Sequence, residues 1–225
     1  MSFELSLYRD AIAPAARFDF APPASTVRAV YVVSGSLRVE TPAFIGALAA
    51  NSALLVPNAL EIRGGSLASV ALRWELMPAG APAAPLQAEG ASSELLLRAP
   101  LALDRAEPYL LRCDRVDFPP GGEALTHTHR GGGIRCLLAG TIEIDTLGAR
   151  HGYRPLEAWF EAGPHPVYAA ASATQDTAFA RVMILPRALL GKPSISYVNT
   201  EDLARPKSQR YQVFIDAPVE LPAAV

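Results

Sequence analysis

Cysteine is nearly absent from the chain, since Cys113 and Cys136 are its only two examples and they do not form a CxxC pair. A disulfide framework is therefore not expected, and we predict two reduced, partly buried thiols. An excess of basic charge is absent too, because 20 Lys and Arg residues face 22 Asp and Glu residues, for a formal net charge of −2. This balance argues against a nucleic-acid-binding protein, which needs a basic patch.

Long apolar runs are also missing, since none approaches the roughly 20 residues that span a bilayer. The first ten residues, MSFELSLYRD, carry acids and lack the apolar centre of a signal peptide. We therefore expect a soluble, cytoplasmic protein whose partner is a small molecule rather than a nucleic acid or a membrane. Half of the 225 residues are hydrophobic and only 19% are charged, a composition that supports a buried core.

Long helices are not expected either, because 20 prolines are scattered through the chain. Short apolar runs rich in Val, Ile, Leu and Tyr are separated by Gly, Pro, Ser and Asn, a pattern typical of strands. A single helical turn is predicted at 200–203, with Thr200 as its cap. The chain is therefore predicted to be all-β. The predicted strands are 27–33, 37–40, 52–56, 67–76, 109–118, 134–138, 141–145, 177–185 and 211–216.

A long repeat divides the sequence. Each copy contains an apolar strand, a turn of small residues and Gly, and an alternating strand, and later segments align in the same order. Such self-similarity indicates one β-unit used twice. The aligned pairs are VYVVSGSLRVE (30–40) with RCLLAGTIEID (135–145), SALLVPNALEI (52–62) with EAWFEAGPHPV (157–167), and LRWELMP (72–78) with ARVMILP (180–186).

The repeat predicts two domains and a tail. The Ala-, Pro- and Gly-rich stretch 78–93 has the composition of an extended linker. We therefore expect an N-terminal domain at 1–88, a C-terminal domain at 89–190 and a tail at 191–225. The strand predicted in the tail needs a partner sheet, because a lone strand leaves its backbone groups unpaired. That partner is either the N-terminal unit or a second subunit.

Histidine is scarce, with four residues and none in the first half of the chain, yet two occur as His127-Thr128-His129. Alternate residues of a β-strand point to the same side, so both imidazoles can bind one metal ion. Imidazole suits zinc, iron, copper and nickel alike. The pair predicts a metal site in the second half of the chain.

A third ligand is needed, and Glu161 and His165 are the candidates. A carboxylate at the end of an apolar strand needs a charged partner or a metal. His165 precedes a proline, which favours an extended conformation. Two histidines and a carboxylate are typical of non-haem Fe(II) oxygenases, whereas three histidines with an open position suit zinc. The sequence leaves both residues open as ligands.

Arg135 is a candidate substrate-binding residue. If strand parity continues from His129, its side chain points inward, unless the glycines at 131–133 break the parity with a bulge. A guanidinium makes a fork that matches a carboxylate, so Arg135 is predicted to orient an anionic or keto-type substrate. The three glycines themselves either open room for that substrate or form a flexible turn.

The histidine pair resembles the first cupin motif, which begins G-x5-H-x-H. Gly121 precedes His127 and His129 at that spacing, and Gly140 matches the glycine that closes the motif. The turn EAGPH at 161–165 resembles the second motif. With the repeat, the whole chain is similar to a two-domain cupin, or bicupin. The resemblance implies a jelly-roll-like antiparallel barrel in each domain, a metal at one open end of a barrel, and a homodimer.

The chain departs from the cupin motifs at several positions. Gly133 stands where the first motif carries a glutamate ligand. Glu161 occupies the proline position of the second motif, and His165 comes one residue early. In the N-terminal repeat Val56 and Leu60 align with these two residues, so that domain is predicted to lack metal ligands.

The resemblance implies dioxygenases, decarboxylases, isomerases and lyases as possible activities, and the missing motif glutamate favours a three-ligand oxygenase. We therefore predict a mononuclear metal-dependent enzyme, dioxygenase-like, that acts on a small organic molecule bearing a carbonyl or carboxylate. Fe(II) is favoured, with Zn, Ni or Mn as alternatives. The predicted ligands are His127, His129, Glu161 and His165, with catalytic roles for Arg135 and Glu161. The alternative is a cupin that binds a small ligand without catalysis.

Overall fold

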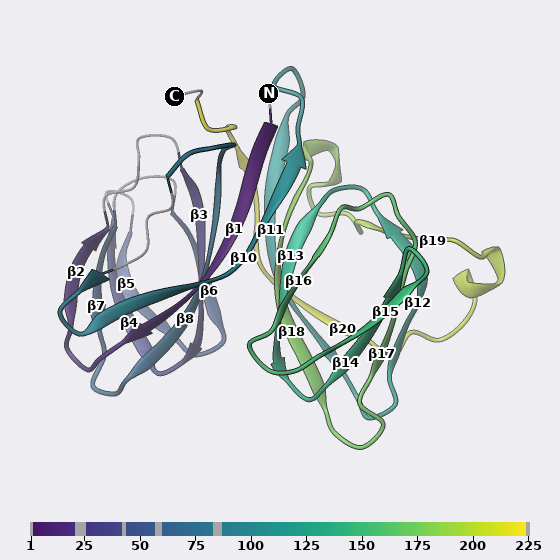
Figure 1. The fold of residues 1–225 in the computed structure, drawn as a ribbon, viewed down its shortest axis with the longest axis horizontal. Coiled ribbons are helices and arrows are strands. Elements are labelled where there is room, and N and C mark those ends of the chain that lie inside the picture. Colours follow the sequence, from purple (N-terminus) through teal and green to yellow (C-terminus); the bar gives the residue numbers. More distant parts are fainter. Residues whose placement is uncertain (1, 21–25, 42–43, 57–59, 83–86, 224–225) are drawn as a thin grey trace. The chain divides into compact units, whose positions relative to one another are not determined.

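The computed structural model describes residues 2–20, 26–41, 44–56, 60–82 and 87–223 (Figure 1). Within these ranges the chain is all-β, as predicted, and its helical structure is limited to two 3-10 turns, η1 (Arg187–Leu189) and η2 (Thr200–Leu203). The second is the predicted helical turn, although Asn199 rather than Thr200 stands at its cap. No helix among the described residues is long and apolar enough to span a membrane.

The chain forms two compact units, Met1–Glu107 with Val219–Val225, and Pro108–Pro218. In the first unit one sheet has the order β6-β3-β8-β1-β10-β9 and the other the order β2-β7-β4-β5. Its strands are β1 (Ser2–Ile12), β2 (Arg17–Phe20), β3 (Val27–Ser34), β4 (Ser36–Thr41), β5 (Phe44–Ala49), β6 (Ser52–Val56), β7 (Leu60–Gly64), β8 (Ser69–Pro78), β9 (Gln87–Ala88) and β10 (Ala91–Ala102).

The second unit repeats this plan. One sheet has the order β16-β13-β18-β11-β20 and the other the order β15-β14-β17-β12-β19. Its strands are β11 (Tyr109–Phe118), β12 (Glu123–His129), β13 (Gly133–Ala139), β14 (Ile142–Thr146), β15 (Ala149–Tyr153), β16 (Ala158–Glu161), β17 (Val167–Ala171), β18 (Thr177–Pro186), β19 (Ile195–Tyr197) and β20 (Arg210–Val219).

The two strand orders confirm the internal repeat. β6-β3-β8-β1-β10 of the first unit corresponds, strand for strand, to β16-β13-β18-β11-β20 of the second. The order β2-β7-β4-β5 corresponds in the same way to β12-β17-β14-β15. Each strand predicted from the apolar runs is present, with ends that differ by a few residues.

The units divide the chain differently from the expected boundaries at 88 and 190. β10 pairs with β1 along its whole length, from Ser2↔Ala102 to Ile12↔Ala91, so it completes the first unit rather than opening the second. β20 lies beside β11, so the predicted tail strand is an integral part of the second unit. Backbone pairing explains both assignments, because a strand belongs with the sheet that satisfies its N–H and C=O groups. Residues 83–86 of the expected linker lie outside the described residues.

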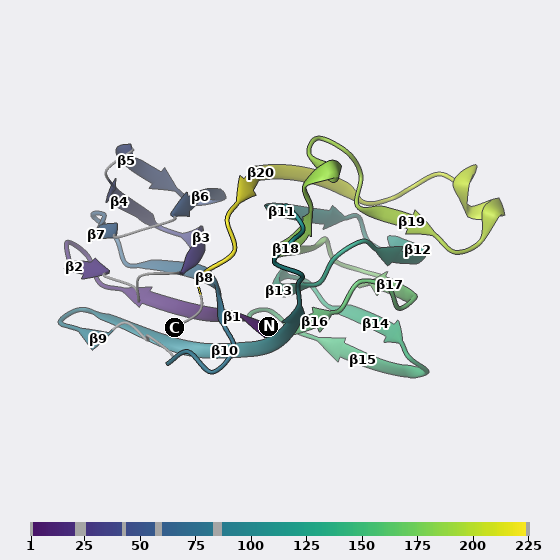
Figure 2. The same cartoon turned by 90° about the horizontal axis from the view of Figure 1, so that it is seen from above.

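The core of the second unit lies between its two sheets. Figure 2 shows β11, β13, β16 and β18 on one side and β12, β14, β15 and β17 on the other. Strand alternation sends every second side chain inward, and burial of each large one is worth about 1.5–3 kcal/mol. Cys113 and Cys136 are free thiols, and both are fully buried in the structure, whereas partial burial was predicted. The core cluster comprises Val116, Phe118, Ala124, Leu137, Ile142, Ile144, Trp159, Val167, Ala169 and Phe179.

Candidate metal centre

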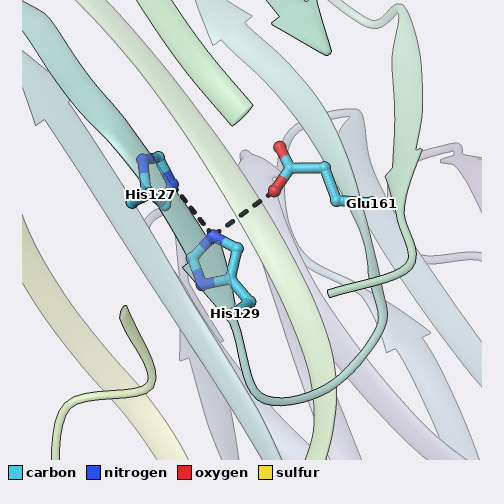
Figure 3. Close-up of side chains that lie close together, drawn as sticks. All are labelled: His127, His129 and Glu161. Atoms are coloured by element: carbon cyan, nitrogen blue, oxygen red, sulfur yellow. Dashed lines mark hydrogen bonds and ion pairs between the residues drawn. The ribbon is translucent and has the colours of Figure 1, made fainter. Parts of the chain in front are cut away.

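His127 and His129 lie on β12 and both point into the second unit. Only 5% and 4% of their surfaces are exposed, whereas Thr128 between them is more accessible. Their Nε2 atoms are 3.2 Å apart and their rings meet edge to face, as Figure 3 shows. The prediction that strand alternation brings the two imidazoles together is confirmed.

Glu161 joins the pair from β16, a strand of the other sheet. Its Oε2 atom lies 3.3 Å from His129 Nε2, and 8% of the residue is exposed. One ligand atom from each of the three residues falls within 4.8 Å of the others. His127, His129 and Glu161 form the candidate metal group of the described residues, and they correspond to the two-His-one-carboxylate pattern, one of the two alternatives that the sequence left open.

Glu161 lies on the strand next to the position where the cupin motif carries its glutamate. Glu161 pairs directly with Gly133 in the register between β16 and β13. Gly133 is the residue that stands where the cupin motif has a glutamate. A Cβ atom there would lie 2.3 Å from the backbone oxygen of Val182 on β18, so no side chain fits. The strand next to Gly133 supplies a carboxylate at the same level of the barrel.

Gly131 and Gly133 therefore serve close packing. A Cβ on Gly131 would lie 2.1 Å from the backbone oxygen of Ile184, so β18 occupies the space beside both glycines. Neither alternative from the sequence, a space for substrate or a flexible turn, describes these positions.

Gly133→Ala is expected to destabilise the protein by about 1–3 kcal/mol, because an added methyl group must displace the backbone of β18. Urea unfolding measures the change. Gly152→Ala is the matched control, since a Cβ at Gly152 meets nothing within 4 Å and we expect a change within about 0.5 kcal/mol. Equal stability of the two variants would contradict the packing argument.

Neighbouring groups orient the ligand side chains. His127 Nδ1 lies 2.7 Å from the carbonyl oxygen of Leu125, so Nδ1 carries the hydrogen and Nε2 carries the lone pair. The β12–β17 register is irregular between Ala124 and His127, at the residue that supplies this carbonyl. Trp159 Nε1 donates a 2.9 Å hydrogen bond to Glu161 Oε1. Trp159 also belongs to the core cluster, and its contact with Glu161 depends on its position two residues before Glu161 in β16.

Arg135 acts on Glu161 rather than lining a substrate cavity. Its guanidinium is fully buried, with Nη2 2.7 Å from Glu161 Oε2 and Nη1 donating 2.6 Å to the carbonyl oxygen of Gly133. The angles between the two groups of this ion pair are not those of a hydrogen bond, so Glu161 Oε2 accepts no well-formed hydrogen bond. The inward direction predicted for Arg135 is correct. Its Nη2 atom contacts Glu161, so Arg135 is a positioning residue for that carboxylate.

His165 does not join the group. β16 ends at Glu161, and the chain then turns at Gly163, whose φ is +111°. The carbonyl oxygen of Gly163 accepts a 2.7 Å hydrogen bond from the N–H of His129, which holds the turn against the end of β12. The His165 side chain is exposed beyond this turn. The structure therefore separates His165 from the other three predicted ligands.

Burial and charge set the protonation of the three groups. Burial lowers the pKa of His127 and lowers that of His129 to about 3, and Arg135 adds to the effect. Burial alone would raise the pKa of the Glu161 carboxyl, but the Arg135 guanidinium, the neighbouring His129 and the hydrogen bond from Trp159 hold that pKa below its usual range. Two neutral imidazoles and an ionised carboxylate are the forms that bind a metal.

The two spacings at His129 fit a metal ion. Two ligands that each lie roughly 2.0–2.1 Å from a cation are separated by about 2.9 Å at a right angle and about 3.4 Å at the tetrahedral angle. The 3.2 Å and 3.3 Å separations at His129 fall between these values. A cavity of about 20 Å³ adjoins the group, enough for one water-sized species. The two spacings at His129 and the small cavity therefore suit a single ion.

Arg181 on β18 and Tyr211 on β20 line this small cavity and also a second, larger one. Arg181 forms a buried ion pair with Asp114, with nitrogen–oxygen distances of 2.6 and 3.1 Å. Sequence reasoning missed both residues. A signal existed for Arg181, because the aligned segments LRWELMP and ARVMILP place Arg73 and Arg181 at the same repeat position in apolar strands.

In the first unit an ion-pair network includes the position equivalent to Gly133. Arg28 pairs across the sheet with Val56 and with Glu75, just as Gly133 pairs with Glu161 and with Met183 in the second unit. Buried side chains here form ion pairs, with 2.8 Å between Arg28 and Glu75 and 2.7 Å between Arg73 and Asp10. The second unit brings metal-binding groups together, whereas the buried charges of the first unit pair with one another.

Comparison with known proteins supports the fold. No protein-family model and no curated protein matches the chain. Among solved structures, AerE from Microcystis aeruginosa is 17% identical with a TM-score of 0.58, over 81% of this chain and 87% of AerE. A formate complex of the oxalate decarboxylase of Lactobacillus farciminis is 11% identical with a TM-score of 0.65, over 89% of this chain and 82% of that enzyme. A glyoxylate-induced protein from Pseudomonas aeruginosa is 14% identical with a TM-score of 0.58, over 80% of this chain and 74% of that protein. All three have the cupin architecture, doubled in the decarboxylase, and this chain has the fold of a two-domain cupin.

Proposed function

We propose that this cupin is a mononuclear metal-dependent enzyme that acts on a small organic molecule bearing a carbonyl or carboxylate. One observation carries the proposal: His127, His129 and Glu161 bring three ligand atoms within 4.8 Å of one another in a buried site. Arg135 compensates the charge of Glu161, but two neutral imidazoles and a carboxylate that have all lost hydration still converge on one place, as the ligands of a metal ion do. Their convergence is therefore best explained by a bound metal.

Fe(II) is the favoured ion, because two histidines and one carboxylate with open positions are typical of non-haem iron oxygenases. Mn is an alternative, since a structural neighbour that is 9% identical, the oxalate decarboxylase of Bacillus subtilis, is described with Mn(II) centres. Zn and Ni complete the set. When bound, such an ion polarises a carbonyl or carboxylate oxygen and supplies open positions for dioxygen or water.

The chain's own residues preorganise the site. The Leu125 carbonyl fixes the tautomer of His127, while Trp159 and Arg135 hold the two oxygens of Glu161. Apolar side chains of Phe118, Val116 and Ile144, among others, line the small cavity and limit water. Side chains fixed in this way need little reorganisation when metal and substrate bind, which is a general source of catalytic efficiency.

The activity test is dioxygen consumption by the Fe(II)-loaded protein with a panel of β-diketones, catechols and thiols. We expect turnover with at least one class, and at least a roughly hundredfold loss in His129→Gln, which removes an imidazole from the centre of the group. No turnover with Fe, Mn, Zn or Ni would favour the alternative, a cupin that binds a small ligand without catalysis. We also propose a homodimer, on the strength of the cupin resemblance, and sedimentation equilibrium tests it.

A further inference from the structure

The second unit contains a cavity of about 530 Å³, which we name the C-terminal chamber. Arg112 and Asp114 of β11 and Arg181 of β18 line one part of it. Residues between 191 and 216, among them Tyr211 and Val213 of β20, line the remainder. The segment that the sequence left as a tail therefore builds a binding space together with the sheet.

The sizes of the two cavities assign different occupants to them. The cavity at the metal group has about 20 Å³, room for a water-sized species only. Small-molecule sites usually have about 300–1,000 Å³, a range that includes the C-terminal chamber. Arg181 and Tyr211 line both cavities, so a ligand in the chamber lies next to the metal group.

Arg181 offers the chamber an unused hydrogen-bond donor. The residue is 5% exposed, and its Nε and Nη2 atoms are bound to Asp114. Its Nη1 has no hydrogen bond within the described part of the chain. Arg112 differs, because Nε and Nη2 bind Asp216 and Nη1 binds the Lys192 carbonyl oxygen.

The charge of the lining favours an anion. The two carboxylates that line the chamber, Asp114 and Asp216, are both paired with arginines. Lys192 and Lys207 also line it and carry the positive excess. A guanidinium edge in a partly desolvated space is a strong site for a carboxylate.

The apolar part of the lining describes the rest of the ligand. Ile195, Tyr211 and Val213 add apolar surface, and the last two are about half exposed, at 46% and 52%. The lining thus places an apolar wall in the same cavity as the guanidinium of Arg181.

We propose that the C-terminal chamber binds an amphipathic organic acid. Its carboxylate accepts a hydrogen bond from Arg181 Nη1, and its apolar body packs on Tyr211 and Val213. The identification of this acid as the substrate rests on the proposed metal-dependent function, whereas its binding in the chamber does not depend on that function.

The test measures binding by ligand-observed NMR and calorimetry with 3-phenyllactate, 4-hydroxyphenylacetate and 2-hydroxyoctanoate, each compared with its methyl ester. We expect at least one acid to bind the metal-free protein, with an ester that binds at least roughly tenfold more weakly. Val213→Trp fills the chamber and is expected to weaken binding of the acid by at least roughly tenfold. Leu203→Trp, at an exposed position outside the lining, is the matched control and is expected to bind like the wild type.

Arg181→Lys provides a second readout, because lysine keeps a charge beside Asp114 but loses the guanidinium fork. We expect it to reduce the difference between acid and ester. The proposal is overturned if no acid binds, if esters bind as well as acids, or if Val213→Trp binds like Leu203→Trp. Metal content is measured on the same preparation after loading with Fe(II), Mn, Zn or Ni, so failure to retain any metal with acid binding intact rejects the proposed function alone.

Discussion

His129→Ala is expected to abolish metal binding, reducing the metal content from about one ion per chain to trace levels. His129 Nε2 is the central atom of the group, 3.2 Å from His127 Nε2 and 3.3 Å from Glu161 Oε2. Its removal leaves His127 and Glu161 without the ligand atom that lies close to both of them. Loss of a supporting contact alone costs roughly 10–100-fold in metal affinity, so loss of a ligand costs more. Elemental analysis after anaerobic loading with Fe(II), and separately with Zn and Mn, measures the effect.

Exposed histidines provide the controls for this experiment. His165→Ala and His151→Ala remove imidazoles that lie at the surface of the second unit, and both variants are expected to keep the metal content of the wild type. His129→Gln repeats the main test with a side chain of similar size, so that a folding defect in His129→Ala does not decide the outcome. Equal metal content in the wild type and both His129 variants would show that the ion binds elsewhere, and loss in His165→Ala would place it at the turn.

The sequence was most informative where local pattern alone decides the structure. In β4 and β14 apolar and polar residues alternate, so Leu37, Val39, Ile142 and Ile144 are buried as the period-two pattern predicts. The histidine pair follows the same rule, since its two members are separated by a single residue of one strand. Both predictions needed no knowledge of which strands are neighbours.

The sequence was least informative where strand pairing decides. The choice between Glu161 and His165, and the role of Arg135, depend on the register that sets Glu161 opposite Gly133, which local pattern does not contain. β10 was hidden for a similar reason, because its residues ASSELLLRAPLA adjoin a linker-like composition and only pairing with β1 defines them as a strand. The C-terminal chamber also depends on strand pairing, because residues of β11 and of its neighbour β20 line it together.

Arg135→Met is expected to destabilise the metal-free protein by about 3–5 kcal/mol, because it leaves the Glu161 carboxylate buried without its cation. Thermal unfolding measures this as a decrease in Tm of roughly 10 °C for a chain of this size. The control is Arg150→Met, which removes an exposed arginine from its contacts with Asp145 and Glu143. We expect that control to change stability by no more than about 1 kcal/mol.

Metal binding distinguishes a positioning role for Arg135 from a purely structural one. A bound cation replaces the guanidinium as the counter-charge of Glu161, so added metal is expected to raise the Tm of Arg135→Met more than that of the wild type. The double variant Arg135→Met/Glu161→Gln removes both charges and is expected to recover much of the lost stability without metal. If metal raises both Tm values equally, or if the double variant is no more stable than Arg135→Met, the ion pair with Glu161 is not what makes Arg135 necessary. Recovery in the double variant together with a larger metal effect in the single variant would assign the buried arginine to the carboxylate that completes the metal group.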